Sequence, residues 1–204
     1  MTAHLLNRQI HHTPARPVLP VLVNMTLRLA RAHEFCGPAR HMLAILVAAA
    51  TRGPVFWIAP AWATEQPNPD GMAALAGPER FTFVTARRPE DILWALEEVL
   101  RSGVVPLAVA DLPDPPGMTA VRRLHLAAEA GAQRGHGAPL GLLVTPGEGG
   151  APGIETRWHM APAHTPGAPG WRLARRRART LPPQDWHLSG QPGKWALTPA
   201  GPPA

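Results

Sequence analysis

Three runs of continuously apolar residues constrain the fold of this chain more than any other feature. They cover residues 55–59, 104–110 and 140–145. Strands that are apolar on both faces are typical of a parallel sheet with helices on each side. Segments of helical character alternate with these runs from Pro38 to Thr145. The sequence therefore predicts an α/β fold with a mostly parallel sheet flanked by helices.

Proline, glycine, acidic and capping residues between the apolar runs indicate where the helices begin and end. Acidic residues after Pro89 suit a helix start, and Ser102-Gly103 ends that helix. Thr119 is expected to cap a later helix, with Gly131 as its stop. Pro106 argues against a fully hydrogen-bonded position inside its strand. We expect helices over residues 38–51, 71–76, 89–102 and 119–130, and a further strand over 81–85.

The ends of the chain have a different pattern. Residues 155–161 and 171–179 are predicted to form a C-terminal antiparallel hairpin at one edge of the sheet. We expect a flexible N-terminal arm over 1–24, a folded domain over 25–188 and a flexible tail over 189–204. Met25 is an alternative start of the protein, because a regular pattern begins there.

The positive charge is concentrated at the C-terminal end. The net charge is +6, and residues 1–156 carry 13 cations and 13 anions, so all of the excess lies beyond residue 156. This asymmetry suits a nucleic acid or an acidic protein surface as partner. The candidate binding residues are Trp171, Arg172, Arg175, Arg176, Arg177 and Arg179.

Strand alternation predicts how these residues are oriented. Trp171 would share a face with Arg175, Arg177 and Arg179, while Arg172 and Arg176 would point the other way. Arginines on both faces suit an exposed edge strand. Such an edge either binds an anionic partner or is kept from aggregating by its charges, and the sequence leaves both readings open.

The tryptophans divide into two groups. Trp57 and Trp94 are expected to be buried. The others lie next to loops, where an indole either marks a contact site or covers an end of the sheet, and these are Trp62, Trp171, Trp186 and Trp195.

Residues 33–42 enter a helix as a phosphate-binding loop does, but without its chemistry. That loop requires G-x-x-x-x-G-K-[ST], in which amides, a lysine and a hydroxyl hold phosphate and magnesium. Here Gly37-Pro38 is followed directly by an apolar helix, and Lys194 is the only lysine in the chain. We therefore expect no nucleotide hydrolysis and no enzymatic activity. Weak anion binding assisted by Arg40 and a plain turn are the remaining alternatives.

The single cysteine excludes an internal disulfide. Cys36 with His33 and His41 does not make a structural zinc site, because four ligands are usual and no second pair is present. No oxyanion segment supports Cys36 as a nucleophile. We expect no metal, no cofactor and no catalytic residue. The longest apolar run is too short to span a bilayer, so we expect a cytoplasmic protein without membrane contact.

From Arg31 to about Leu188 the chain resembles ImuA, a RecA-like accessory protein of bacterial damage-induced mutagenesis that is related to the SulA cell-division inhibitors. The resemblance covers over half the chain and depends on several segments in combination. They are HEFCGPARHMLAIL at 33–46, GPVFWIAPAW at 53–62, RRPEDILWALEEVLRSGVVPLAVADLPDPPGMTAVRRLHLAAEAG at 87–131, LGLLVTPGEGG at 140–150, ETRWHMAP at 155–162 and WRLARRRAR at 171–179.

The resemblance implies a degenerate RecA-like domain. Gly37 and Pro38 would lie where the phosphate loop starts, with Arg40 beside them, and Asp111 would take the place of the magnesium-associated acid. It further implies a non-catalytic accessory protein of SOS-induced translesion synthesis. The implied partners are an ImuB-like protein, an error-prone C-family DNA polymerase and RecA.

Two other functions stay open at the level of sequence. One is direct DNA binding through the C-terminal arginines, which would show a strong decline of affinity with salt. The other is a SulA-like inhibitor of the division protein FtsZ, which would arrest division when overproduced. An ATPase would require stabilisation by nucleotide, which the sequence gives no reason to expect.

Overall fold

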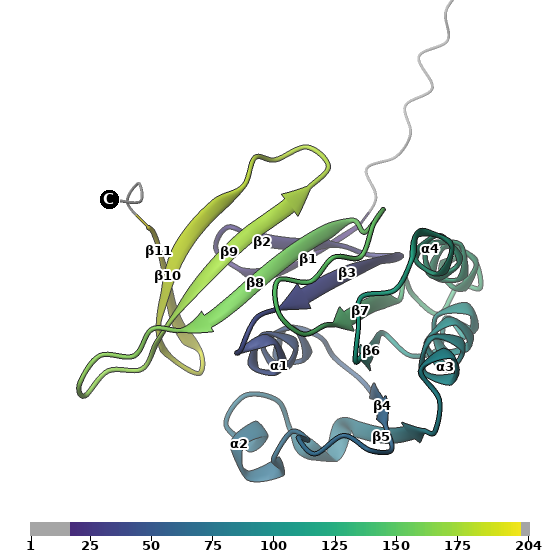
Figure 1. Cartoon of the computed structure of the whole chain (residues 1–204), viewed down its shortest axis with the longest axis horizontal. Coiled ribbons are helices and arrows are strands. Elements are labelled where there is room, and N and C mark those ends of the chain that lie inside the picture. Colours follow the sequence, from purple (N-terminus) through teal and green to yellow (C-terminus); the bar gives the residue numbers. More distant parts are fainter. Residues whose placement is uncertain (1–16, 201–204) are drawn as a thin grey trace, which may run out of the picture.

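The computed structural model describes residues 17–200, which form a nine-stranded sheet, a separate β-hairpin and helices on both faces of the sheet (Figure 1). The hairpin consists of β1 (Val18–Leu22) and β2 (Met25–Arg28). In order across the large sheet, the strands are β11 (Lys194–Pro199), β10 (Gln184–Gln191), β9 (Gly170–Ala178), β8 (Thr156–Pro162), β3 (Arg31–Cys36), β7 (Leu140–Val144), β6 (Leu107–Asp111), β4 (Val55–Pro60) and β5 (Phe81–Ala86).

The six strands from β5 to β8 run parallel, and β9, β10 and β11 continue the sheet in antiparallel fashion. The prediction of a mostly parallel α/β sheet with a C-terminal antiparallel hairpin is confirmed. The antiparallel part has two more strands than expected, because β10 and β11 follow the hairpin of β8 and β9. Strand β9 consequently lies inside the sheet and not at its edge.

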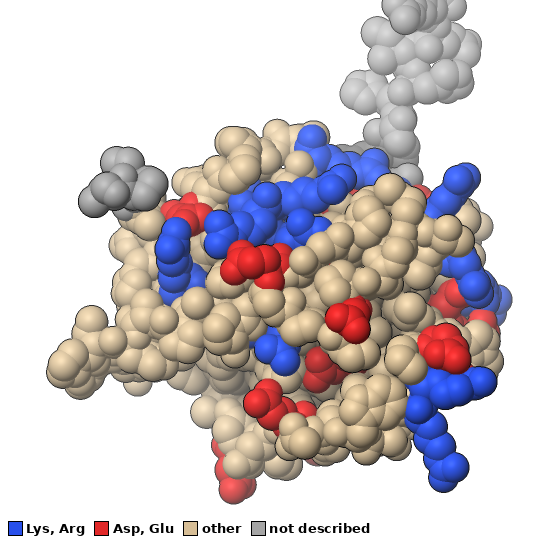
Figure 2. Space-filling model, in the orientation of Figure 1, with Lys and Arg blue, Asp and Glu red and all other residues tan. Residues whose placement is uncertain are grey.

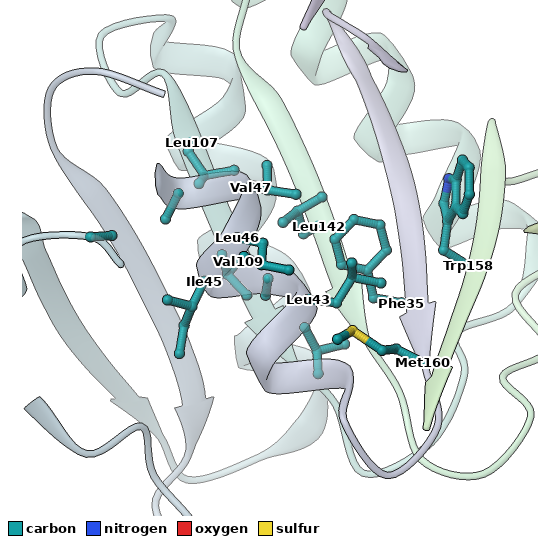
Figure 3. Close-up of a cluster of buried hydrophobic side chains, with 14 of the residues drawn as sticks. Phe35, Leu43, Ile45, Leu46, Val47, Leu107, Val109, Leu142, Trp158 and Met160 are labelled. Carbon is teal, nitrogen blue, oxygen red and sulfur yellow. The ribbon is translucent and has the colours of Figure 1, made fainter. Parts of the chain in front are cut away.

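One face of the sheet is covered by α1 (Arg40–Ala50), α2 (Pro69–Ala73) and the β1–β2 hairpin. Helix α1 is apolar on nearly every side, and residues 43–48 are all buried, as its sequence predicts. Figure 3 shows Leu43, Leu46 and Val47 of this helix packed among Phe35, Val109 and Leu142 of the sheet. The core continues to Trp158 and Met160 on β8.

The opposite face is covered by α3 (Pro89–Ser102) and α4 (Met118–Ala132), which pack on β3, β4, β6 and β7. The two helices meet closely where α3 ends. Gly103 follows α3 in the left-handed conformation at φ 70°, and Gly131 of α4 lies directly against it. Strands β8 to β11 extend beyond both helices, so this face of the antiparallel part stays uncovered by them (Figure 1).

Several helix and strand ends differ from the sequence predictions. Helix α1 starts at Arg40, so Pro38 precedes it and does not form its first turn. Helix α4 is capped by Gly117 and runs through Gly131, so Thr119 is not its cap and Gly131 is not its stop. Strand β6 begins at Leu107, which leaves Pro106 outside the strand.

Both expected flexible ends contain regular structure. Strand β1 occupies residues 18–22 of the arm expected over 1–24, and residues 1–16 lie outside the described part of the chain. Strand β11 occupies residues 194–199 of the expected tail, and residues 201–204 also lie outside. The folded domain therefore extends past the predicted limits of 25 and 188 at both ends. No helix within residues 17–200 is long and apolar enough to cross a membrane.

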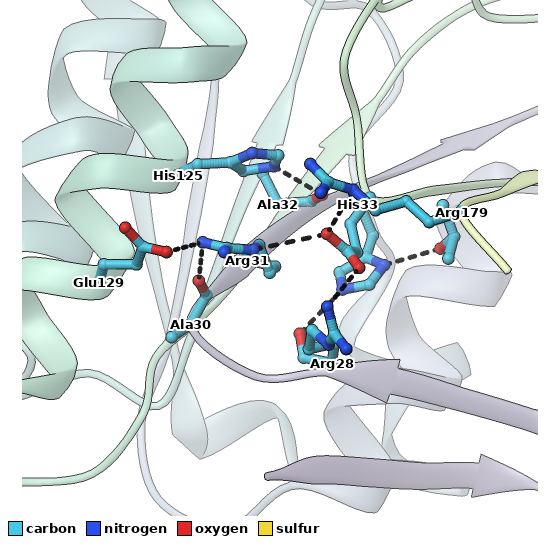
Figure 4. A network of polar contacts seen from close by, with 10 residues as sticks. Arg28, Ala30, Arg31, Ala32, His33, His125, Glu129 and Arg179 are labelled. Atoms are coloured by element: carbon cyan, nitrogen blue, oxygen red, sulfur yellow. Dashed lines mark hydrogen bonds and ion pairs between the residues drawn. The ribbon is translucent and has the colours of Figure 1, made fainter. Parts of the chain in front are cut away.

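Strand β3, at the centre of the sheet, carries buried polar residues and anchors a polar network (Figure 4). Arg31 pairs with Glu129 of α4 and with Glu155, and Glu155 also pairs with Arg28 and Arg179. His33 is fully buried, with Nδ1 2.7 Å from Oγ1 of Thr156 and Nε2 3.0 Å from the carbonyl oxygen of Arg28. Because a carbonyl oxygen only accepts, Nε2 of His33 carries a proton.

Burial lowers the pKa of His33 from 6.5 to about 4, which makes stability depend on pH. Between these values the unfolded chain binds a proton that the folded chain excludes. The free energy of unfolding should therefore fall as pH drops from 6.5 to 4, by about 3 kcal/mol in total from this group. Urea unfolding at a series of pH values measures the slope, and His33→Gln should flatten it. An unchanged slope in that variant would assign the acid sensitivity to other groups.

Candidate functional site

A pocket of about 340 Å³ lies at the carboxyl ends of β4, β6 and β7, beside the start of α1. Open parallel sheets bind ligands at this end of their strands. The pocket is lined by Arg40, His41, Pro60, Trp62, Ala63, Thr64, Glu65, Asp111, Leu112, Pro113 and Pro146.

Asp111, the last residue of β6, is held by a histidine. Its Oδ2 lies 2.8 Å from Nε2 of His41, which comes from the first turn of α1. Asp111 is 8% exposed, and the ring of His41 meets the indole of Trp57 edge-on at 5.8 Å. The carboxylate thus has a protein hydrogen-bond partner at the place where a magnesium-associated acid was expected.

The turn between β3 and α1 is closed by backbone hydrogen bonds. The amide of Gly37 donates to the carbonyl of Gly147, that of Ala39 to Met160, and that of Arg40 back to Gly37. Pro38 has no amide hydrogen. All the amides of residues 37–40 that a phosphate would need are therefore engaged.

Gly37 is needed in this turn for two reasons. Its φ is +89°, and a Cβ there would lie 2.5 Å from the carbonyl oxygen of Met160 and 2.7 Å from Nε2 of His159. Strand β8 consequently sits against the turn, and its backbone and His159 fill the space beside Gly37.

The structure brings together only part of the predicted nucleotide site. Arg40 and Asp111 line the pocket, while Gly37 and Pro38 form the adjoining turn. Nη1 of Arg40 donates to the carbonyl oxygen of Gly37 at 3.4 Å, and its buried Nε has no hydrogen-bond partner. The sequence did not reveal His41 as the partner of Asp111, because the two residues lie 70 positions apart on different elements. It did not reveal Trp62 and Glu65 as pocket residues, because loop contacts carry no periodic signal.

Cys36 and its neighbouring histidines do not converge. Cys36 is fully buried, with Sγ 3.5 Å from the carbonyl oxygen of Trp158, and burial raises the pKa of its thiol to about 12. Such a thiol is a poor nucleophile. Within residues 17–200, no group of His, Cys, Asp and Glu side chains is placed to hold a metal ion.

The arginine cluster on β9 has a different arrangement from the predicted one. Arg175 is 5% exposed, and its guanidinium lies 5.7 Å from the ring of Trp158 and 5.1 Å from that of Trp186. It donates to the carbonyl oxygen of Pro182 and to Gln184, and burial lowers its pKa. Arg175 is therefore a structural residue of the core, and its assignment to a binding surface was wrong.

A β-bulge explains the changed orientation of the other arginines. The register between β8 and β9 shifts at Arg157 and Trp158, so Trp158 pairs with Arg175 while Arg157 pairs with Arg177. Arg176 is the extra residue, and the bulge breaks the simple alternation assumed from sequence. Arg177 lies opposite Arg157, whose side chain contacts Glu34, so both lie on the uncovered face.

Most of these arginines have carboxylate partners. Arg172 pairs with Asp185, with Nε 3.1 Å from Oδ2, and Arg179 lies 3.3 Å from Glu155. Arg176 lies 3.4 Å from Glu148. Figure 2 shows blue side chains gathered over β8 and β9, with acidic side chains next to them.

The tryptophans also depart from expectation in part. Trp57 is buried as predicted, but Trp94 is 61% exposed on α3, so its prediction as a core residue was wrong. Trp186 is buried on β10 and not at a loop. Trp171 and Trp195 pack edge to face at 5.8 Å, and Trp62 stays 50% exposed at the pocket.

No family model matches the sequence, and no curated protein matches it either. Among solved structures, the chain is similar to the crystal structure of SulA from Pseudomonas aeruginosa, with 19% sequence identity and a TM-score of 0.45 over 57% of this chain and 98% of that chain. A likeness of this size carries no argument about function. The resemblance to ImuA therefore depends on the residues of the sequence alone.

Proposed function

We propose that this protein is a non-catalytic accessory factor on a degenerate RecA-like scaffold, which acts by binding other proteins in damage-induced translesion DNA synthesis. The proposed partners are an ImuB-like protein, an error-prone C-family polymerase and RecA. The sequence resemblance supplies this cellular setting. The geometry at the carboxyl end of the sheet supports the non-catalytic part.

The closed turn from Gly37 to Arg40 is the observation that carries the proposal. Phosphoryl transfer depends on amides, a lysine and a metal that together neutralise the phosphate charge. Here the amides of Gly37, Ala39 and Arg40 already donate hydrogen bonds to backbone carbonyls. Asp111 is bonded to His41, and no lysine lies in this part of the sequence. The protein's own groups thus take up the contacts that a nucleotide would use.

Trp62 is the best candidate for a protein contact at this end of the sheet. It is half exposed beside Arg40, and tryptophan and arginine are the residues most enriched among energetically dominant interface positions. A partner side chain entering the pocket of about 340 Å³ would cover this indole. The proposal therefore places the contact at the pocket.

The test is capture of each purified partner from the same organism by the tagged full chain. A chain cut before Trp171 would lack the arginine cluster, but it would also lose the core residues Leu173, Trp186 and Leu188, so it is not a suitable variant for this test. Trp62→Asp should instead reduce capture at least roughly tenfold, in the range of a hot-spot residue. Leu126→Asp is the matched control, since Leu126 is 56% exposed on α4, away from the pocket.

The outcomes separate the parts of the proposal. Failure of the folded chain to capture any of the three partners would refute the translesion setting. A rise in melting temperature with ATP and Mg²⁺ would contradict the inference that the protein's own groups take up the nucleotide contacts, because a ligand that binds the native state stabilises it. Arrest of cell division on overproduction, without capture of a polymerase partner, would favour an inhibitor of division.

A further inference from the structure

The face of β8, β9 and β10 that α3 and α4 leave uncovered carries a cationic surface, defined here as Arg172, Arg176 and Arg177. All three are exposed and belong to β9. Cross-strand pairing sets His187 opposite Arg172, and Asp185 and His159 on either side of Ala174. The bulge places Arg176 and Arg177 together near one end of this surface. Figure 2 views it face-on, over β8 and β9.

An exposed carboxylate lies within the cationic surface. Glu148 belongs to the short loop after β7, and its oxygens lie 3.3 Å from Nε2 of His159 and 3.4 Å from the guanidinium of Arg176. Burial lowers the pKa of His159, so its ring is neutral near pH 7 and Arg176 provides the charge. The side chain of Glu148 is nevertheless 73% exposed. Exposed ion pairs of this kind are weak, about 0 to 1 kcal/mol, so another anion can replace the carboxylate.

The cationic surface lacks the apolar centre of a protein interface. Within residues 17–200, no exposed large hydrophobic residue lies on β8, β9 or β10 themselves, and Leu181 is in the loop that joins β9 to β10. Protein interfaces usually combine a desolvated aromatic or aliphatic core with a polar rim. A surface of arginines without such a core fits a ligand that offers a series of charges, as a phosphate backbone does.

We propose that the cationic surface binds the phosphate backbone of a nucleic acid, and that Glu148 occupies one of its anion positions until a phosphate displaces it. The contact is independent of base sequence, because it uses guanidinium groups and no element that could enter a groove. It does not depend on the proposed protein partners, and none of its three arginines lines the pocket at Trp62.

Fluorescence anisotropy with a labelled 30-nucleotide oligo-dT, and with a duplex of the same length, tests the proposal at several salt concentrations. Glu148→Gln should raise the affinity about fivefold, since it removes the competing charge. Arg176→Gln with Arg177→Gln should lower the affinity at least roughly tenfold and reduce the slope of log K against log salt by about 1.5.

The matched control is the double variant Arg52→Gln with Arg134→Gln, which removes the same charge from exposed sites elsewhere. It should retain most of the affinity. An equal loss in the control, or an unchanged affinity in Glu148→Gln, would overturn the assignment to the cationic surface. Binding of polyglutamate as tightly as the oligonucleotide would overturn the nucleic-acid assignment and indicate an acidic protein partner. No binding at 50 mM salt would overturn both.

Discussion

Replacing Gly131 by alanine is expected to lower the free energy of unfolding by about 4 kcal/mol, near the upper end for a single substitution. Gly131 lies inside α4 where the end of α3 contacts it. A Cβ at this position would overlap the carbonyl oxygen of Leu100 and lie 3.1 Å from the Cα of Gly103. These are backbone atoms that cannot rotate aside, so the two helices would have to separate and expose part of their shared core.

Chemical denaturation of Gly131→Ala measures the loss. Gly71→Ala is the control, because Gly71 also lies inside a helix but nothing is within 4 Å of its added Cβ. That substitution should leave stability unchanged or raise it by up to about 1 kcal/mol through helix propensity. A loss below about 1 kcal/mol in Gly131→Ala would mean that the helices can shift without cost.

Replacing Glu34 by glutamine is expected to cost about 3 to 5 kcal/mol, the range for breaking one side of a buried ion pair. Glu34 is fully buried on β3. Its carboxylate accepts from the hydroxyl of Thr145, from the amides of Gly150 and Ala151, and from the guanidinium of Arg157. A glutamine would place an NH₂ group against one of these donors and leave Arg157 without its counter-charge.

The loss for Glu34→Gln is measured by urea unfolding at pH 7. Glu148→Gln makes the same chemical change on the neighbouring loop, but at a side chain that is 73% exposed, and should alter stability by no more than about 0.5 kcal/mol. Similar values for the two variants would show that the contacts of Glu34 are replaceable. The control also establishes that the Glu148 variant used for nucleic-acid binding is folded.

The parts of the fold that the sequence predicted are those in which burial and periodicity agree. Strand β4 and strand β7 are apolar throughout, and α3 has its acids, apolar stripe and Gly103 in the expected places. Strand β3 was missed although it lies at the centre of the sheet. Its buried residues include Arg31, His33 and Glu34, whose polarity hides the strand pattern because their partners come from distant segments.

The candidate site was predicted to a similar extent. Arg40 and Asp111 line the same pocket because strand ends and helix starts converge at one end of a parallel sheet. Arg175 was misassigned because its burial depends on Trp186 of β10, a strand that was not predicted. The orientation of Arg177 depends on a bulge that single-sequence alternation does not reveal. Trp94 shows the opposite error. It was predicted to be buried because tryptophan is largely apolar, but its side chain is exposed.

The position of β3 has a consequence for how the protein is made. Residues 31–36 pair with residues 140–144 on one side and with residues 157–159 on the other. Joining segments so far apart costs loop-closure entropy and slows folding. During synthesis the N-terminal part emerges first. The residues of β3 therefore stay without their strand partners until the segments that form β7 and β8 have been synthesised. The middle of the sheet can therefore be completed only after β7 and β8 have left the exit tunnel, although the segment that forms its central strand is among the first to be made.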